Sequence, residues 1–475
     1  MRLSPSIPFL MPEADMARLH ERAVRILAEV GVRVTEPRLR KRLQGKRGLS
    51  FVGDRVMLTP ELVAQTVNLC ERQKKPAPAQ PKTAERISIM TGGHARHILD
   101  LATGSLRPFT EKDAVEMAKL TDALRVRDVL GEVPDTPQDL PPTLRNVAQY
   151  RIALEWCRGR HYASVSCAAE ARFIREMAKV AGKNFGLELY LISPLRLEGN
   201  ELEMVLDYLE TCPESEKPIP VGIASMPTMG LSAPVDPLSL FVLGIAESLG
   251  GCVLMRLALE GEANVGFGRI NAYPCDFQSG ALVVGTPEAA LIEVVRRDFD
   301  RFYRHGAFGR ALRTMSPVPG IQAAAEKAAG AVVCALAGYE TFHGGGLLAL
   351  DEIFSPVQLL IDCDIRDYAL QVARGFEPDN SFDDVAVLRD ALAAESDPLP
   401  FLTHPTTVAG FRKVFSPSAL FQRAVCRKDV MPQEDILARA RSEAQRLIAS
   451  HDYRLDAAPL REIERIYRRA TEELG

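Results

Sequence analysis

The sequence predicts an α/β protein: a (β/α)₈ TIM barrel with an N-terminal extension of helices and a β-hairpin, and with helices at its C-terminus. Between residues 128 and 405, short apolar runs alternate with longer amphipathic segments in eight units. Strands separated by helices pair in parallel through right-handed crossovers, and eight such units close into a barrel. No glycine-rich dinucleotide fingerprint follows the first of these strands, which argues against a doubly wound sheet. We therefore expect an extension (1–127), a barrel (128–431) and a helical appendage (432–475).

The extension is expected to begin with helices. Apolar residues recur at helical spacing from Leu19 to Val30, and Gly31 follows as a helix-ending glycine. A second helix is expected after Thr59-Pro60, because threonine caps helices and proline fits their first turn. Residues 86–110 alternate apolar and polar residues around glycine turns, which predicts short antiparallel strands. The segment Thr110-Glu111-Lys112-Asp113 predicts a capping box at the start of the next helix.

The barrel region carries eight candidate strands and the helices that connect them. The expected strands are Val129–Val133, Tyr162–Ser166, Glu188–Ser193, Ile219–Ala224, Asn264–Gly268, Gly306–Arg310, Glu340–Gly344 and Pro400–His404. The expected helices include Ala168–Ala181, Glu201–Thr211, Leu238–Leu259, Pro287–Tyr303, Ile321–Leu336 and Pro356–Arg374. Two amphipathic helices are expected in residues 432–474, and such an appendage packs on the barrel or on a second subunit.

Composition indicates a folded protein of the cytoplasm. The 475 residues are 47% hydrophobic and 25% charged, with a net charge of −4 and no basic stripe, which argues against nucleic-acid binding. The nine cysteines include no C-x-x-C pair, which is typical of reduced thiols. The most apolar segment, Pro237 to Leu259, carries Glu247 and Arg256, so we expect no membrane span, and no signal peptide is expected either.

Several stretches spread along the chain carry a family resemblance. They are LHERAVRILAEVGVRV near the N-terminus, ILDLATGSLRPFTEKDAVEMAKLTDAL (98–124), PIPVGIASMPTMGLSAPV (218–235), AEKAAGAVVCALAGYETFHGGG (325–346), FSPVQLLIDCDI (354–365) and the tail EDILARARSEAQRLIASH. These stretches resemble the trimethylamine methyltransferase family, whose pyrrolysine-free members act on glycine betaine and related amines. No single motif is diagnostic, but their order and coverage are specific. Pyrrolysine does not appear in this sequence, so the mechanism of the pyrrolysine-containing members is not supported.

The resemblance implies a methyltransferase that moves a methyl group from a tertiary or quaternary amine, one that is betaine-like, to the cobalt of a separate corrinoid protein. This chain would hold no tightly bound cofactor, because the partner supplies the cobalamin. A quaternary ammonium leaves as a neutral amine, so no general acid is obligatory; the protein must desolvate the cation and align its C–N bond. The resemblance and the amphipathic C-terminal helices also indicate a homo-oligomer.

Candidate catalytic residues are sought at the C-terminal ends of the strands, where barrel enzymes carry their active sites. His343 is at the end of the seventh expected strand, with Gly344 and two further glycines behind it that would let a ligand approach the backbone. His343 would orient the substrate, or it is a core histidine beside a tight turn. Glu132 ends the first expected strand, where its carboxylate would neutralise an ammonium or cap the next helix.

Candidate substrate-binding residues occur in two Phe-Gly-Arg repeats. Arg269 and Arg310 follow the fifth and sixth expected strands, and together they would bind a carboxylate, or pair with acids at the rim. Phe267 and Phe308 stand two residues before these arginines, hence on the same strand face, and would wall the methylated end. Tyr190 is a further candidate pocket wall, although any of these aromatic residues would also fill a core.

No metal site is expected, because neither His94 with His97 nor the segment Asp362–Asp364 has further ligands at a recognisable spacing. Two other functions stay open from the residues alone. One is a divergent barrel lyase or hydrolase, since a fold does not fix a function. The other is a non-catalytic paralogue that binds a ligand or the corrinoid protein.

Overall fold

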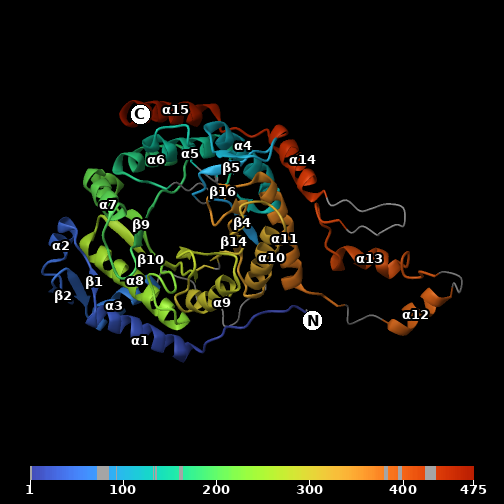
Figure 1. The fold of residues 1–475 in the computed structure, drawn as a ribbon, viewed down its shortest axis with the longest axis horizontal. Helices are drawn as coiled ribbons and strands as arrows, with labels where there is room; N and C mark the ends of the chain where they lie inside the picture. The colour runs from blue at the N-terminus through green and yellow to red at the C-terminus, as the bar shows by residue number, and fades with distance from the viewer. Residues whose placement is uncertain are drawn as a thin grey trace.

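The elements of the chain are arranged in a ring, with helices on the outside and strands on the inside (Figure 1). The computed structural model describes residues 3–71, 85–92, 94–131, 133, 136–159, 164–306, 308–378, 383–393, 398–422 and 435–475. The fold is a mixed α/β fold, as the alternation of strands and helices predicts.

Two parallel sheets line the inside of the ring. The first has the strand order β13-β14-β4-β7 and the second has the order β10-β9-β8, and every neighbouring pair in them is parallel. Their strands are β4 (Ser88–Met90), β7 (Val129–Leu130), β8 (Leu187–Leu191), β9 (Ile219–Ser225), β10 (Ala263–Ile270), β13 (Phe308–Gly309) and β14 (Thr341–His343). The strands expected at 188–193, 219–224, 264–268 and 340–344 are thus confirmed in place, and those expected at 129–133 and 306–310 are present but reduced to two residues each.

Two strand predictions are wrong. Ser88–Met90, expected in an antiparallel hairpin, lies between β14 and β7 as a parallel strand, since Ile89 is fully buried and pairs with Phe342 and Val129. A three-residue apolar run shows no periodicity that tells parallel from antiparallel pairing. Residues 400–404 form no strand; His404 caps α13 (Pro405–Val414), where a proline in the first turn favours a helix start. The expected strand 162–166 begins outside the described residues.

The helices follow the prediction closely, because proline and N-cap residues mark where they begin. Several have an Asp, Thr or Ser N-cap followed by proline, as in α8, α9 and α11. The helices between the parallel strands are α4 (Glu111–Ala123), α5 (Pro142–Trp156), α6 (Ala168–Val180), α7 (Asn200–Thr211), α8 (Pro237–Ala258), α9 (Pro287–Phe302) and α10 (Ile321–Leu336), with α11 (Pro356–Arg374) after the last strand. Short 3₁₀ turns lie at Leu124–Arg127 and Glu214–Glu216.

The N-terminal helices pack against the outside of the ring. They are α1 (Glu13–Glu29), α2 (Pro37–Leu43) and α3 (Pro60–Glu71), with a small antiparallel sheet of β1 (Val32–Arg33), β2 (Leu49–Val52) and β3 (Arg55–Leu58). At Gly250 of α8 an added Cβ would lie 2.8 Å from Leu27 and 2.7 Å from Val32, so this glycine lets α1 approach closely. The helix α8 is long and apolar enough to cross a membrane, but 89% of its apolar window is buried, which identifies it as a core helix.

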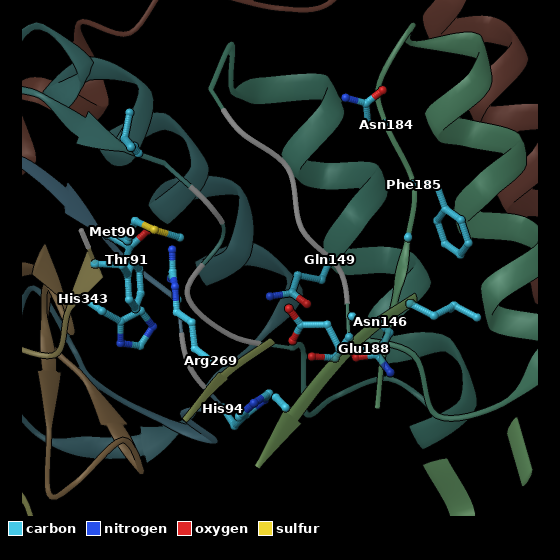
Figure 2. Close-up of a pocket in the computed structure, with 18 of the residues that line it drawn as sticks. Met90, Thr91, His94, Asn146, Gln149, Asn184, Phe185, Glu188, Arg269 and His343 are labelled. Atoms are coloured by element: carbon cyan, nitrogen blue, oxygen red, sulfur yellow. The ribbon is translucent and has the colours of Figure 1, made fainter. Parts of the chain in front are cut away.

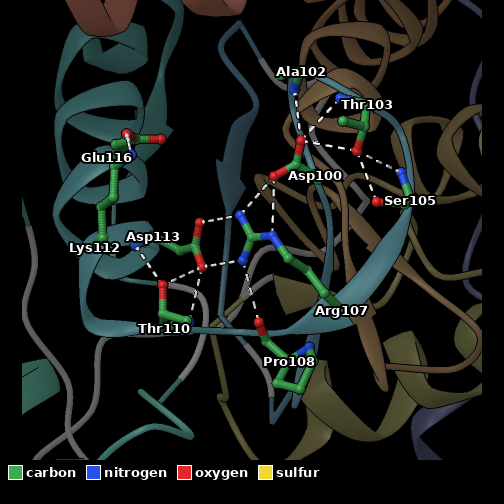
Figure 3. A network of polar contacts seen from close by, with 10 residues as sticks. All are labelled: Asp100, Ala102, Thr103, Ser105, Arg107, Pro108, Thr110, Lys112, Asp113 and Glu116. Carbon is green, nitrogen blue, oxygen red and sulfur yellow. Dashed lines mark hydrogen bonds and ion pairs between the residues drawn. The ribbon is translucent and has the colours of Figure 1, made fainter.

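A hairpin ties the start of the ring to α4. β5 (His97–Leu99) and β6 (Leu106–Pro108) are antiparallel, as predicted, and β16 (Ile353–Phe354) and β15 (Leu347–Leu348) extend their sheet. Arg107 donates to Asp113 at 2.6 and 2.8 Å and to Asp100 at 2.8 and 2.9 Å (Figure 3). The backbone N–H of Thr103 and the Arg107 guanidinium lower the pKa of Asp100 to about 2. The predicted capping box of Thr110 and Asp113 is confirmed.

The C-terminal helices α14 (Ile436–Ala449) and α15 (Ala457–Leu474) pack on the same chain. Ala440 and Ala444 of α14 are buried in the core that includes α4 and α11, and Ile463 and Ile466 of α15 are buried against α5 and α6. By contrast, α12 (Asp384–Leu392) and α13 lie well outside the ring (Figure 1). A short antiparallel pair, β11 (Cys275–Asp276) and β12 (Ala281–Leu282), completes the described strands.

Candidate functional site

A cavity of about 1640 Å³ lies inside the ring. Each of the seven described parallel strands contributes at least one residue to the lining of this cavity. Leu130, Gly222, Gly266 and Phe308 are among them, as are Met90, Glu188 and His343, which Figure 2 labels. Because parallel strands separated by helices end at the same side of a sheet, this lining includes the strand ends where barrel enzymes carry their chemistry.

The cavity exists because small residues occupy positions that face the interior. Three neighbouring strands are in register at Glu188 of β8, Gly222 of β9 and Gly266 of β10. Barrel interiors are normally filled by layers of branched side chains, whereas two of these three positions have no side chain. A Cβ added to Gly266 would meet no atom within 4 Å, so this layer of the ring is open space beside a carboxylate.

A β-bulge directs Arg269 into the cavity. Phe267 of β10 pairs with Ile223, and Ile270 pairs with Ser225, so β10 has one more residue than β9 in this interval. An extra residue reverses the alternation of faces. Arg269 therefore lines the cavity, whereas Phe267 packs outward on Tyr303 and His305, with ring centroids 5.0 and 5.1 Å apart. The expectation that Phe267 and Arg269 share a face is wrong for this reason.

Arg269 stacks on Phe308 across the two sheets. Its guanidinium carbon lies 4.7 Å from the centroid of the Phe308 ring, a cation–π geometry. In the part of the chain that the structure describes, no carboxylate forms an ion pair with Arg269, and burial lowers its pKa while Asp300 acts in the opposite direction. Arginine stays protonated even so, and this one presents its donors to the cavity.

His343 also lines the cavity and is held by a second arginine. Nε and Nη2 of Arg313 lie 3.4 and 3.3 Å from Nδ1 of His343, and Nη1 donates to Asp351 at 3.1 Å. The His343 ring is 5.5 Å from the Phe308 ring. Burial, followed by the Arg313 charge, holds the pKa of His343 well below its usual range. His343 is therefore a neutral imidazole.

Gly344 shapes the turn behind His343. Its φ is +104°, and an added Cβ would lie 2.6 Å from the carbonyl oxygen of Leu312, so glycine is required for backbone reasons. The carbonyl of Gly344 accepts from Lys327 at 3.3 Å, and Lys327 pairs with Asp362 at 2.7 Å. Both charged side chains are completely buried. Gly344 is not among the described residues that line the cavity, so its expected contact with substrate stays a prediction.

Arg310 and Tyr190 have partners of their own. Arg310 donates through Nε to Glu293 at 2.8 Å and through Nη2 to the Ala272 carbonyl at 2.7 Å. Burial would lower the pKa of Arg310, but the Glu293 charge raises it overall. Tyr190 accepts from Asn271 at 3.4 Å, and burial raises its pKa. Neither side chain is among the described cavity-lining residues, and Glu132 lies outside the described part of the chain.

Several polar residues of the cavity are not among the sequence-based candidates. They include Asn271 and Arg313, and also Glu188, His94 and the α5 residues Asn146 and Gln149, which Figure 2 labels. Glu188 could have been selected from the sequence, because a charged residue inside an otherwise apolar strand is unusual and points to a functional site. Arg313 stands four residues past the end of β13, so no strand-end rule selects it.

The arrangement provides hydrogen-bond donors and a carboxylate in one cavity. Arg269, Arg313 and His343 supply donors, and Glu188 supplies a negative charge that acts on Arg269. A ligand with an anionic end and a cationic end fits such a cavity better than a simple cation does. Among the described residues, no three His, Cys, Asp or Glu side chains are grouped as metal ligands.

Comparison with known proteins identifies one family. The sequence model described as trimethylamine methyltransferase (MTTB) matches residues 4–475. The trimethylamine methyltransferase MttB of Methanosarcina barkeri (strain Fusaro) is 28% identical over 307 residues, which are 60% of this chain and 56% of that protein. The chain thus matches a little over half the length of this relative. The glycine betaine methyltransferase of Desulfitobacterium hafniense (strain Y51) is 24% identical over 467 residues, 93% of this chain and 92% of that protein.

Among solved structures, the crystal structure of the Methanosarcina barkeri monomethylamine methyltransferase (MtmB) covers 93% of this chain and 89% of its own, with 12% identity and a TM-score of 0.48.

Proposed function

The chain belongs to the trimethylamine methyltransferase family, and we propose that it transfers a methyl group from a methylated amine bearing a carboxylate to the cobalt of a separate corrinoid protein. The observation that supports a carboxylate on the substrate is Arg269, a half-buried cation that faces the cavity and forms no ion pair with a carboxylate among the described residues. A substrate carboxylate would supply the missing counter-charge through a charge-assisted hydrogen bond.

The substrate would lie between the donors and Glu188. Arg269 and His343 bind the carboxylate, Phe308 walls the site, and Glu188 faces the ammonium across the layer opened by Gly222 and Gly266. The sequence also predicts Phe308 as a pocket wall. Phe267 and Arg310 have no role in the proposed site, because Phe267 packs on Tyr303 and Arg310 forms an ion pair with Glu293. Glu132 stays a candidate for the ammonium, outside the described residues.

The chain's own contribution is binding and alignment. The partner's cobalt is the methyl acceptor, and its corrinoid belongs to that protein. A quaternary ammonium that loses a methyl group leaves as a neutral amine, so it needs no proton, and the neutral His343 is consistent with this. Removal of water from the cavity strengthens the attraction between the carboxylate and Arg269 and holds the C–N bond in one orientation.

We propose that the two parallel sheets belong to one closed (β/α)₈ barrel. The lining of a common cavity by all seven described parallel strands supports closure, and the strand expected at 162–166, which begins outside the described residues, would be the eighth. Because β4 lies between β14 and β7, the barrel would begin at Ser88 rather than at residue 128, and it would end with β14 and α11. Residues 432–475 remain an appendage.

We also propose a homo-oligomer in the cytoplasm. The segment from α12 to α13 exposes a run of large apolar residues, namely Val385, Leu388, Leu392, Leu399, Phe401, Leu402, Val408, Phe411, Val414 and Phe415. Exposed apolar side chains concentrated in one segment are typical of an association site, and a second copy of the chain is the occupant we propose. Light scattering would show one subunit mass, 52.2 kDa, if this is wrong.

Calorimetry with a panel of amines tests the substrate class. Glycine betaine and longer trimethylammonium carboxylates should bind, whereas trimethylamine and tetramethylammonium should bind at least about tenfold more weakly, the minimum expected for losing a charge-assisted hydrogen bond. Equal affinity for betaine and tetramethylammonium would contradict a carboxylate site. Tight betaine binding without methyl transfer to any corrinoid protein would favour the non-catalytic paralogue.

A further inference from the structure

Arg313 makes contacts that fix its guanidinium beside His343. Its side chain is 10% exposed and donates to Asp351 at 3.1 Å on one edge. On the other edge, Nε and Nη2 lie 3.4 and 3.3 Å from Nδ1 of His343. A guanidinium has donors only and does not lose its charge in proteins. Nδ1 of His343 must therefore accept, which means that it carries no proton.

The other ring nitrogen then holds the only proton of the imidazole. A neutral histidine has one N–H, so an unprotonated Nδ1 requires a protonated Nε2. The charged and titratable groups that act on His343 are Arg313, Arg310 and His94, and each of them disfavours a second proton. Asp351 lies on the other side of Arg313 and accepts a hydrogen bond from its guanidinium.

We propose that Arg313 is a positioning residue that fixes His343 as the neutral Nε2–H tautomer, so that His343 offers a hydrogen-bond donor whose charge stays constant over physiological pH. The inference rests on the proposed function in one respect: the donor serves the carboxylate of the substrate beside Arg269. His343 is then neither a general acid nor a general base. The site should favour a substrate that has a hydrogen-bond acceptor at this position, because leaving the Nε2–H of His343 without a partner would cost binding free energy.

Nuclear magnetic resonance of the full-length protein tests the tautomer without any substrate. The chain has eight histidines, so ¹⁵N labelling of histidine gives a small spectrum, and His343→Gln assigns the signal. We expect Nε2 to show the shift of a protonated nitrogen and Nδ1 that of an unprotonated one, unchanged from pH 5.5 to 8.5. A protonated Nδ1, or a titration of His343 near its ordinary pKa of about 6.5, would overturn the proposal.

The variant Arg313→Met removes the charge and the donors at similar length. The ring of His343 should then populate both tautomers and its pKa should rise toward the ordinary value, although burial still lowers it, while Arg313→Lys, which keeps the charge, should hold the ring neutral but lose the single tautomer. Arg446→Met, at an exposed arginine of α14, is the matched control and should leave the His343 signals unchanged. Unchanged signals in Arg313→Met would overturn the role of Arg313, and the melting temperature of each variant shows that the fold is intact.

Binding separates this inference from the proposed function. The Kd for glycine betaine should be constant with pH in the unmodified protein, and in Arg313→Met it should fall toward the acidic end of this pH range, because a protonated His343 attracts the carboxylate. If the tautomer is as stated but betaine does not bind, the proposed substrate class fails and the positioning role of Arg313 stands. If betaine binds and His343 titrates normally, the proposed substrate class stands and the positioning role of Arg313 fails.

Discussion

The guanidinium of Arg269 lies over the ring of Phe308 at 4.7 Å, although the two residues belong to different sheets. The contact joins β10 to β13 at the wall of the cavity and leaves the edge of the guanidinium for a ligand. A flat cation on an aromatic ring keeps its in-plane hydrogen-bond donors available. This pair is the centre of the proposed carboxylate site.

Replacing Arg269 tests this site. Arg269→Met should raise the Kd for glycine betaine by about 10- to 100-fold, since a hydrogen bond to a charged group contributes about 1.5–3 kcal/mol. Affinity for tetramethylammonium should change little, because that cation has no carboxylate. Calorimetry on both ligands gives the comparison, with the exposed Arg18→Met of α1 as the control. Equal losses for both ligands would point to general damage rather than to a carboxylate contact.

Two glycines of β10 should respond oppositely to substitution. Gly266→Leu places a side chain in open space and should preserve the melting temperature while abolishing betaine binding, because it fills the layer beside Glu188. Gly268→Ala should destabilise the protein, because its Cβ would clash with the backbone carbonyl of Ile223. Thermal unfolding measures the stability of both variants, and calorimetry measures their affinity for betaine. Unimpaired betaine binding in a folded Gly266→Leu protein would place the substrate elsewhere.

The buried pair of Lys327 and Asp362 supports the turn that follows His343. Lys327→Met should lower the free energy of unfolding by about 3 kcal/mol or more, because it leaves a buried carboxylate without its cation. The double variant Lys327→Met with Asp362→Leu should recover only part of this loss, because the Gly346 N–H and the Gln358 amide would lose their acceptor on Asp362. Denaturant unfolding measures both. A single variant as stable as the unmodified protein would show that the pair is dispensable.

Glu247 predicts a specific dependence of stability on pH. Burial in α8 raises the pKa of Glu247 to about 7, and the bonds from Leu195 N–H and the Ser193 hydroxyl lower it only in part. In the unfolded chain the group titrates near 4.5, so between these values the folded state binds more protons. The free energy of unfolding should therefore decrease as pH rises from about 4.5 to about 7, by up to about 3 kcal/mol from this residue.

Glu247→Gln should remove that contribution, because its amide does not titrate. Urea unfolding at pH 5 and at pH 8 should show a smaller decrease for the variant than for the unmodified protein. The same decrease in both proteins would mean that Glu247 is ionised in the folded state at pH 5.

The sequence predicts the helices better than the interior of the ring. Helix ends follow local chemistry, such as the caps Asp236, Thr286 and Ser355, each followed by proline, and the predicted bounds of α8, α9 and α11 agree with the structure to within one residue. The strands are short, and their partners are distant in sequence. Whether Ser88–Met90 pairs with a hairpin arm or with β14 depends on contacts more than 250 residues away, since Thr341 pairs with Ser88.

The candidate site shows the same limit. His343, Arg269 and Phe308 line one cavity, and strand-end reasoning selects all three. It fails for Phe267 because a single inserted residue reverses the facing of β10, and for Arg310 because Glu293 of α9 reaches its guanidinium. Neither the bulge nor the ion pair leaves a local pattern in the sequence.

Methyl transfer itself is the most direct test of the central claim. The protein is mixed with a reduced corrinoid protein and glycine betaine labelled with ¹³C in its methyl groups, and the cobalt absorbance and the amine product are followed together. The account predicts methyl-cobalt and dimethylglycine in equal amounts, with Arg269→Met strongly impaired. If no betaine in a broad panel yields methyl-cobalt, while the same corrinoid protein accepts a methyl group from another methyltransferase, the account is wrong.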